Sequence, residues 1–179
     1  MKKVNVLFLN NGDLRDKEKN MAEITIRGLK NLNDLETLAE HYANYYLESV
    51  LEEKWSKETA LQLFKYFYNH APDLFFIAYD EDKPVGVIMT LLKPWWDGMH
   101  LEDGEVFVCK EYRKLGIAKK LFKALFEYAI ENYDAKTLEA HTYEDENGFP
   151  YCWYKRLGFE TIDDWKIISG DIKQIVNKL

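Results

Sequence analysis

The segment from residue 105 to 118 constrains the fold more than any other part of this sequence. It reads as a short apolar strand, a basic turn, and a helix that opens at Gly116. The first turn of such a helix leaves up to four backbone N–H groups without helical partners, and the helix dipole makes them attract anions. Three basic side chains add positive charge there: Arg113, Lys114 and Lys119. The pattern predicts a cradle for a pyrophosphate.

The rest of the chain alternates between strand and helix patterns. Two amphipathic helices show apolar residues at the 3.6-residue period, and an apolar hairpin follows them. The expected elements are, in order, a strand at 24–27, helices at 33–50 and from 56, a hairpin of 74–79 and 85–92, a loop at 93–103, a strand at 105–108, a helix over 117–129, a strand at 137–142, a short helix from 150, and strands at 159–161 and 165–169. This order predicts an α/β (α+β) fold with a mixed, mostly antiparallel sheet flanked by helices.

Length and composition fit one globular domain. The chain has 179 residues, of which 47% are hydrophobic and 31% charged, a balance that excludes a disordered or collagen-like chain. Residues 1–22 stand apart as an N-terminal extension, with one possible strand followed by a polar linker. We expect residues 23–179 to form the functional domain.

Charge and cysteine usage narrow the function classes. Lys and Arg number 24 against 31 Asp and Glu, so the net charge is −7, and nucleic-acid binding is disfavoured as the main function. An acidic protein suits small cationic substrates. Cys109 and Cys152 form no disulfide framework or metal motif, and no apolar window reaches the roughly 18 residues of a membrane span. We therefore expect a cytoplasmic protein with no metal, no nucleic-acid partner and no membrane partner.

Two motifs in this sequence carry a family resemblance. Arg113-x-x-Gly116-x-Ala118 after an apolar strand resembles the acetyl-CoA signature Q/R-x-x-G-x-G/A of the GCN5-related N-acetyltransferases (GNAT family). The later residues Asn147, Tyr154 and Leu157-Gly158-Phe159 are similar to a second pattern of that family, N-x(6)-Y-x-x-L-G-F. The resemblance extends from about Ile24 to the C-terminus and leaves out residues 1–22.

The resemblance implies a cofactor site. In the family, the main chain of the turn binds the pyrophosphate of coenzyme A, the preceding strand pairs with the pantetheine arm, and an asparagine bonds the cofactor. The implied cofactor-binding residues here are Phe107, Val108, Arg113, Lys114, Leu115, Gly116, Ile117, Ala118, Lys119 and Asn147. Acetyl-CoA is thus the implied co-substrate.

The chemistry of acetyl transfer indicates which other groups are needed. An alkylammonium is almost fully protonated at pH 7, so a base must take a proton before the amine attacks. Family members often carry an acid at the position of Glu105, while Glu102, Asp103 or a chain of waters are alternatives. The backbone N–H of Val108 would stabilise the carbonyl oxygen as the family does. Tyr154 resembles the family tyrosine that assists departure of the thiolate.

The sequence therefore predicts an N-acetyltransferase that moves an acetyl group directly from acetyl-CoA to a primary amine. The expected acceptor is small and cationic, such as a polyamine or an aminoglycoside, and a peptide amine is an alternative. Trp95 and Trp96 are candidates for lining the acceptor site by cation–π contact. A non-catalytic CoA-binding sensor or interaction module of the same fold is the alternative function. Apolar residues among 1–22 leave a homodimer contact open.

Overall fold

A computed structural model describes residues 23–48 and 53–177. The N-terminal extension expected at residues 1–22, with its possible strand and dimer contact, lies outside the described residues. Contacts along the chain divide it into two compact units, Met1–His141 and Thr142–Leu179, and each is described by itself below.

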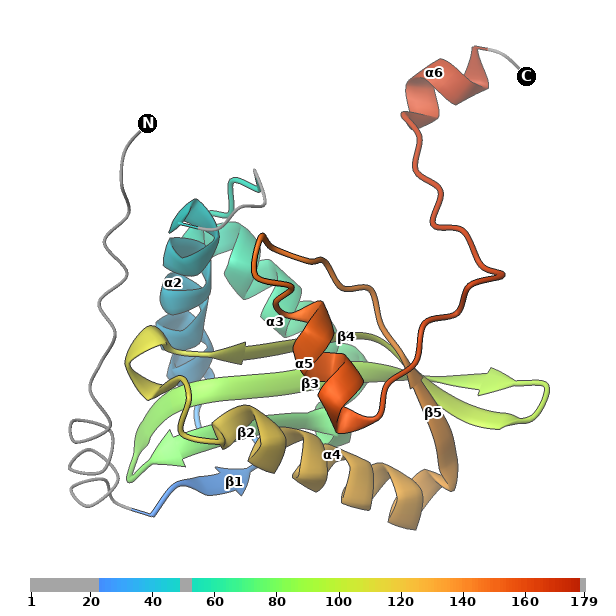
Figure 1. The fold of residues 1–179 in the computed structure, drawn as a ribbon. Helices are drawn as coiled ribbons and strands as arrows, with labels where there is room; N and C mark the ends of the chain where they lie inside the picture. Colours follow the sequence, from blue (N-terminus) through green and yellow to red (C-terminus); the bar gives the residue numbers. More distant parts are fainter. Residues whose placement is uncertain (1–22, 49–52, 178–179) are drawn as a thin grey trace. The chain divides into compact units, whose positions relative to one another are not determined.

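A five-stranded sheet forms the centre of the first unit (Figure 1). Its strands lie in chain order: β1 (Thr25–Arg27), β2 (Phe75–Asp80), β3 (Lys83–Trp95), β4 (Gly98–Val108) and β5 (Ala135–Glu139). Neighbouring strands are antiparallel except for β4 and β5, which run parallel. The expected mixed, mostly antiparallel sheet is confirmed.

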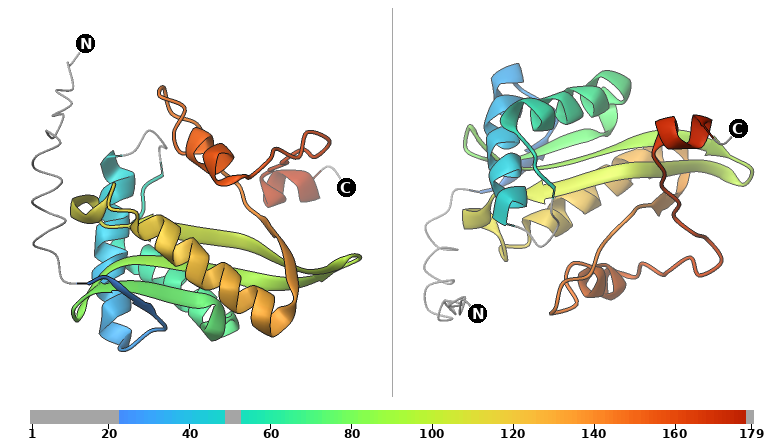
Figure 2. Two further views of the ribbon diagram at one scale, coloured as in Figure 1. Left: turned by 60° about the horizontal axis from the view of Figure 1, so that its bottom comes forward. Right: turned by 90° about the horizontal axis from the view of Figure 1, so that it is seen from above.

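Helices cover both faces of this sheet, as Figure 2 shows. Helices α2 (Leu32–Glu48) and α3 (Lys57–His70) pack together over β3 on one face, and α4 (Ile117–Tyr133) packs across β2 to β5 on the other. Ser56 caps α3 through a capping box with Thr59, which satisfies backbone N–H groups at the helix start. The core between α2, α3 and the sheet is rich in aromatic side chains, including Tyr42, Phe64, Phe67, Phe75, Tyr79 and Phe107. Short 3₁₀ turns follow α3, as η1 (Pro72–Leu74), and β4, as η2 (Lys110–Tyr112).

The prediction of a loop over residues 93–103 was wrong. These residues continue β3 and begin β4, so the two strands form one long hairpin whose last pair is Trp95 with Gly98. The Lys93 ammonium binds the Glu102 carboxylate across the hairpin at 2.8 Å and also lies 4.4 Å from the Trp95 ring centroid. Such cross-strand pairs stabilise a strand that its own sequence pattern does not indicate.

The second unit contains helices α5 (Tyr151–Leu157) and α6 (Ile172–Val176). As predicted, a short helix begins here, with α5 starting after Pro150. It ends at Gly158, which adopts the left-handed conformation that favours glycine (φ +99°). The strands predicted at 159–161 and 165–169 were wrong, because the structure shows no strand in residues 159–169. Ile167 and Ile168 are 76% and 91% exposed. A strand needs a neighbouring strand to pair with, and no described strand lies beside this segment.

Candidate active site

The start of α4 presents backbone N–H groups in an open setting. Gly116 precedes the helix in the left-handed conformation (φ +75°) and no side chain caps the helix there. The first helical hydrogen bond runs from the Lys120 N–H to the Gly116 carbonyl at 3.2 Å, so the amides of residues 117–119 lie ahead of the helical ladder. A Cβ at Gly116 would meet nothing within 4 Å. Space and donors for an anion therefore coincide at this turn.

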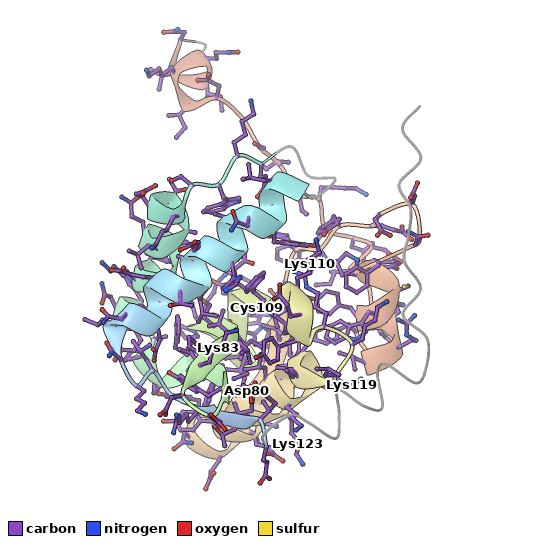
Figure 3. The ribbon with its side chains drawn as sticks, turned by 90° about the vertical axis from the view of Figure 1, so that its left-hand side faces the viewer. Asp80, Lys83, Cys109, Lys110, Lys119 and Lys123 are labelled. Carbon is purple, nitrogen blue, oxygen red and sulfur yellow. The ribbon has the colours of Figure 1, made fainter. Side chains whose placement is uncertain are left out.

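The turn before α4 is held to the sheet by its own residues. The Cys109 N–H donates to the Val85 carbonyl at 2.9 Å, and the Tyr112 hydroxyl donates to Asp80 Oδ2 at 2.8 Å. The Lys83 ammonium lies 5.4 Å from the centroid of the Tyr112 ring. These contacts fix the chain that leads into the N–H groups of α4. Figure 3 shows this side of the molecule, where several lysines gather near the turn: Lys83, Lys110, Lys119 and Lys123.

The Arg113 side chain contacts the protein itself. Its Nε–H donates to the Val108 carbonyl at 2.9 Å, and its guanidinium stacks over the Tyr45 ring at 4.4 Å. The side chain thereby ties the turn to the end of β4 and to α2. A role of Arg113 in binding pyrophosphate, which stays a prediction, would use its main chain and its charge.

Strands β4 and β5 separate part-way along β4. Their last pair is Glu102 with Glu139, whereas β4 continues to Val108. A β-bulge lies at this point, because three steps along β4 from Glu102 to Glu105 match only two steps along β3. Asp103 takes a positive φ of 53° there, and the buried Thr90 hydroxyl donates to the Glu102 carbonyl at 2.9 Å. The bulge increases the local bend where β5 ends.

The separated part of β4 has one edge that faces away from β3. In an antiparallel pair, every second residue of a strand hydrogen-bonds to the neighbouring strand. Because the Cys109 N–H donates to the Val85 carbonyl, the main chains of residues 105, 107 and 109 bond to β3. The N–H groups of Val106 and Val108 therefore point to the opposite edge. This orientation leaves Val108 available as the expected main-chain donor. The Phe107 main chain pairs with β3, and its side chain is buried in the core.

Glu105 is a half-buried carboxylate on the α2 side of β4. The Tyr42 hydroxyl donates to its Oε2 at 3.3 Å. Burial raises the pKa of Glu105 to about 7, and the negative charge of Glu53 adds to the rise. An acid with this pKa exists in both protonation states near neutral pH, which is the property a general base needs. The rival acids have different surroundings: Glu102 is paired with Lys93 and Asp103 is exposed at the bulge.

The tryptophans proposed for an acceptor site lie elsewhere. Trp95 and Trp96 are at the tip of the β3–β4 hairpin, where Trp96 is 87% exposed. The strand between that tip and Glu105 is about 20 Å long at roughly 3.3 Å per residue. They therefore do not surround Glu105. The aromatic neighbours of Glu105 come instead from α2, whose sequence pattern shows only an apolar helix face.

The remaining predicted residues belong to the second unit. Asn147 is exposed in a turn where Asp145 Oδ1 accepts from the N–H groups of Asn147 and Phe149, each at 2.8 Å. Tyr154 is half-buried in α5, with the Phe159 ring centroid at 5.4 Å. The motif residues thus form a compact local structure. Their part in the chemistry stays a prediction.

Two kinds of feature are absent from residues 23–48 and 53–177. No set of three or more His, Cys, Asp and Glu side chains is arranged to hold a metal ion. No helix in those ranges has the length and apolar character to cross a membrane. Burial raises the pKa of the Cys109 thiol to about 11, so this cysteine stays protonated at neutral pH and is a poor nucleophile.

Comparison with known proteins decides the family. The model of the acetyltransferase (GNAT) family matches residues 35–159. The chain belongs to the GNAT family. Its match includes β4, the turn at Gly116 and the whole of α4, and it ends at Phe159 of the second motif. The fold and the family resemblance expected from the sequence are both confirmed, and the protein is an acetyl-CoA-dependent acetyltransferase.

One relative is similar to this chain in sequence, and two solved structures are similar to it in fold. N-alpha-acetyltransferase 30 of Schizosaccharomyces pombe (strain 972 / ATCC 24843) is 28% identical over 123 residues, which cover 66% of this chain and 80% of that protein. A possible acetyltransferase from Clostridium difficile 630 has a TM-score of 0.67 at 21% identity, covering 83% of this chain and 97% of the other. A predicted acetyltransferase from Clostridium acetobutylicum, solved with acetyl-CoA, has a TM-score of 0.61 at 16% identity, covering 82% and 96%.

Proposed function

We propose that this GNAT enzyme transfers an acetyl group directly from acetyl-CoA to the primary amine of a small cationic acceptor, with Glu105 as the base. The observation that carries the proposal is the half-buried Glu105 carboxylate, with a pKa of about 7. It lies on the part of β4 whose outer edge pairs with no strand among the described residues. A base of this pKa removes a proton from an ammonium at neutral pH without being permanently charged in a poorly hydrated site.

Binding of acetyl-CoA would use main-chain groups of this chain. The amides at the start of α4 and the residues from Arg113 to Lys119 suit the pyrophosphate, because they combine free donors with positive charge. The outward N–H groups of Val106 and Val108 suit an extended arm that pairs with β4 like an added strand. Asn147 completes the proposed cofactor-binding set. When bound, acetyl-CoA supplies an activated acyl group and a thiolate leaving group.

The proton balance assigns one task to each remaining residue. Glu105 takes a proton from the acceptor ammonium, so that the nitrogen lone pair is free to attack the thioester carbonyl. The Val108 N–H donates to the carbonyl oxygen as it gains negative charge. Tyr154 donates a hydrogen bond or a proton to the departing sulfur as the carbon–sulfur bond breaks. The acceptor nitrogen loses its second proton to water as the amide forms. Tyr154 takes a proton back from water if it gave one to the sulfur, and Glu105 returns its proton to water.

The acceptor class rests on charge. The net charge of −7 and the acidic pair Glu53 and Glu105 favour a cationic amine such as a polyamine or an aminoglycoside. A peptide amine is a second candidate, favoured by one observation: the relative from S. pombe is named an N-alpha-acetyltransferase. An α-ammonium, with a pKa of roughly 8, also needs less help from a base of pKa about 7 than an alkylammonium does.

Acceptor screening with the full chain tests the proposal. Spermidine, an aminoglycoside and a short unblocked peptide are each mixed with acetyl-CoA, and thiol release is measured beside acetylated product. Glu105→Gln should lower kcat/KM most at neutral pH and less at high pH, where the amine loses its proton unaided. A ratio of variant to parent that stays flat across pH would remove Glu105 as the base. Binding of CoA without turnover of any amine would favour a sensor or interaction module.

A further inference from the structure

Tyr42 is a buried residue of α2 whose hydroxyl contacts the candidate base, Glu105. The side chain is 2% exposed, and the hydroxyl donates to Glu105 Oε2 at 3.3 Å. Sixty-three positions separate the two residues along the chain. The contact is therefore made by the packing of α2 on β4 and not by any local motif.

The Tyr42 ring is held on several sides by other aromatic rings. Their centroids lie between 4.7 and 5.6 Å from that of Tyr42, and they belong to Tyr46, Trp55, Phe64 and Phe107. A ring packed in this way has no freedom to swing its hydroxyl elsewhere. Burial and the neighbouring Glu105 charge hold the pKa of Tyr42 well above its usual range, so the hydroxyl keeps its proton and stays a donor.

We propose that Tyr42 is a positioning residue for the base: its hydroxyl fixes the Glu105 carboxyl group at the open edge of β4 and favours the carboxylate that accepts the amine proton. This inference rests on the proposed function, because it assigns Tyr42 a task in a reaction in which Glu105 is the base. It concerns a residue that no sequence motif of the chain includes.

The charged and titratable groups around Glu105 set the direction of the effect. Tyr42 and Tyr46 face it from α2 and Glu53 faces it from the segment before α3, while the residue opposite on β3 is the apolar Met89. Burial and Glu53 raise the pKa of Glu105, whereas the hydrogen bond from Tyr42 lowers it. Removing that hydroxyl alone would therefore raise the pKa further, and more of the acid would carry a proton at neutral pH.

Tyr42→Phe tests the inference because it keeps the ring and deletes the donor. The Glu105 titration is followed by carbon NMR of protein labelled at the glutamate carboxyl, with Glu105→Gln used to assign the resonance. We expect the midpoint to rise by roughly half to one pH unit, which corresponds to one hydrogen bond. The apparent pKa of the acid limb in the pH profile of kcat/KM should rise by the same amount. This profile is measured with whichever of spermidine, the aminoglycoside or the peptide is turned over.

Tyr79→Phe is the matched control. Tyr79 is also fully buried and its hydroxyl also donates to a carboxylate, Asp34 Oδ2, at 2.8 Å, yet it has no contact with Glu105 among those described. Tyr79→Phe should leave the Glu105 midpoint and the acid limb unchanged, whatever it does to stability.

The outcomes separate this inference from the proposed function. An unchanged Glu105 midpoint in Tyr42→Phe overturns the positioning role of Tyr42 and leaves Glu105 as the base. A midpoint that rises while the acid limb stays in place overturns the assignment of Glu105 as base, and with it the catalytic task given to Tyr42. A rise in both, absent from Tyr79→Phe, establishes the inference.

Discussion

Replacing Gly116 with valine tests the cofactor cradle directly. The residue sits at φ +75°, a conformation that costs an L-residue roughly 1–2 kcal/mol. No protein atom lies within 4 Å of the position that its Cβ would take, so the new side chain causes strain but no clash inside the protein. The space it would enter is the space we assign to the pyrophosphate of CoA.

The expected loss of CoA affinity follows from the hydrogen bonds that the side chain would block. A hydrogen bond to a charged group contributes roughly 1.5–3 kcal/mol. If the valine holds the phosphate away from one main-chain N–H of residues 117–119, the dissociation constant rises about 10- to 100-fold. Calorimetric titration of the full chain with CoA, well below the unfolding temperature, measures this change.

Gly158→Val is the matched control for the backbone strain. Gly158 also has a positive φ, +99°, and open space at its Cβ position, but it ends α5 and is no part of the proposed cradle. Both variants should lose stability in thermal unfolding, while only Gly116→Val loses affinity. Equal CoA dissociation constants in the two variants would refute the placement of the cradle.

Three further outcomes are expected. Tyr154→Phe should bind CoA normally and lower kcat about 100-fold, at the lower end of general-acid effects; an unchanged kcat where chemistry limits the rate would exclude the tyrosine. Between pH 4.5 and 7 folded Glu105 keeps a proton that the unfolded chain has lost, so stability falls across this window. The free energy of unfolding of Glu105→Gln should not fall in this way, and by pH 8 it should exceed that of the parent by up to about 3 kcal/mol. Urea unfolding measures both proteins, and equal pH dependence would contradict the raised pKa of Glu105. A chain starting at Met21 should bind CoA like the full chain, and a folded chain that fails to bind would show that residues 1–20 take part.

Sequence reasoning succeeded where a structure is decided by neighbours along the chain. The start of α4 at Gly116 and the end of α5 at Gly158 each need a residue in the left-handed conformation. A glycine in the sequence indicates such a position, because glycine adopts that conformation without steric cost. The start of α3 after Ser56 is equally local. The cradle, which stays a prediction, rests on the signal at Gly116 alone, because its groups lie within a few residues of one another.

Features that depend on pairing with another segment were missed. Residues 93–103 form a hairpin because the two strands pair with each other, with the Lys93–Glu102 ion pair lying across them. The 159–169 segment has strand-like residues but no described neighbour. The contact of Tyr42 with Glu105 spans 63 positions, and a tyrosine in an apolar helix face gives no sign of what its hydroxyl will meet. Tertiary context decides such cases.

The β4 bulge, at the point where β4 and β5 separate, depends on a single extra residue. If Asp103 were deleted, Gly104 would fall opposite Thr90, while Glu102 and Glu105 would keep their partners Leu91 and Met89. The ladder with β3 would then be regular, and the local bend that accompanies a bulge would be lost. The loss of one codon would thus remove the bend at the point where β4 leaves β5 without displacing either acidic residue, so length variation at this point of β4 should be more costly to a lineage than at the hairpin tip.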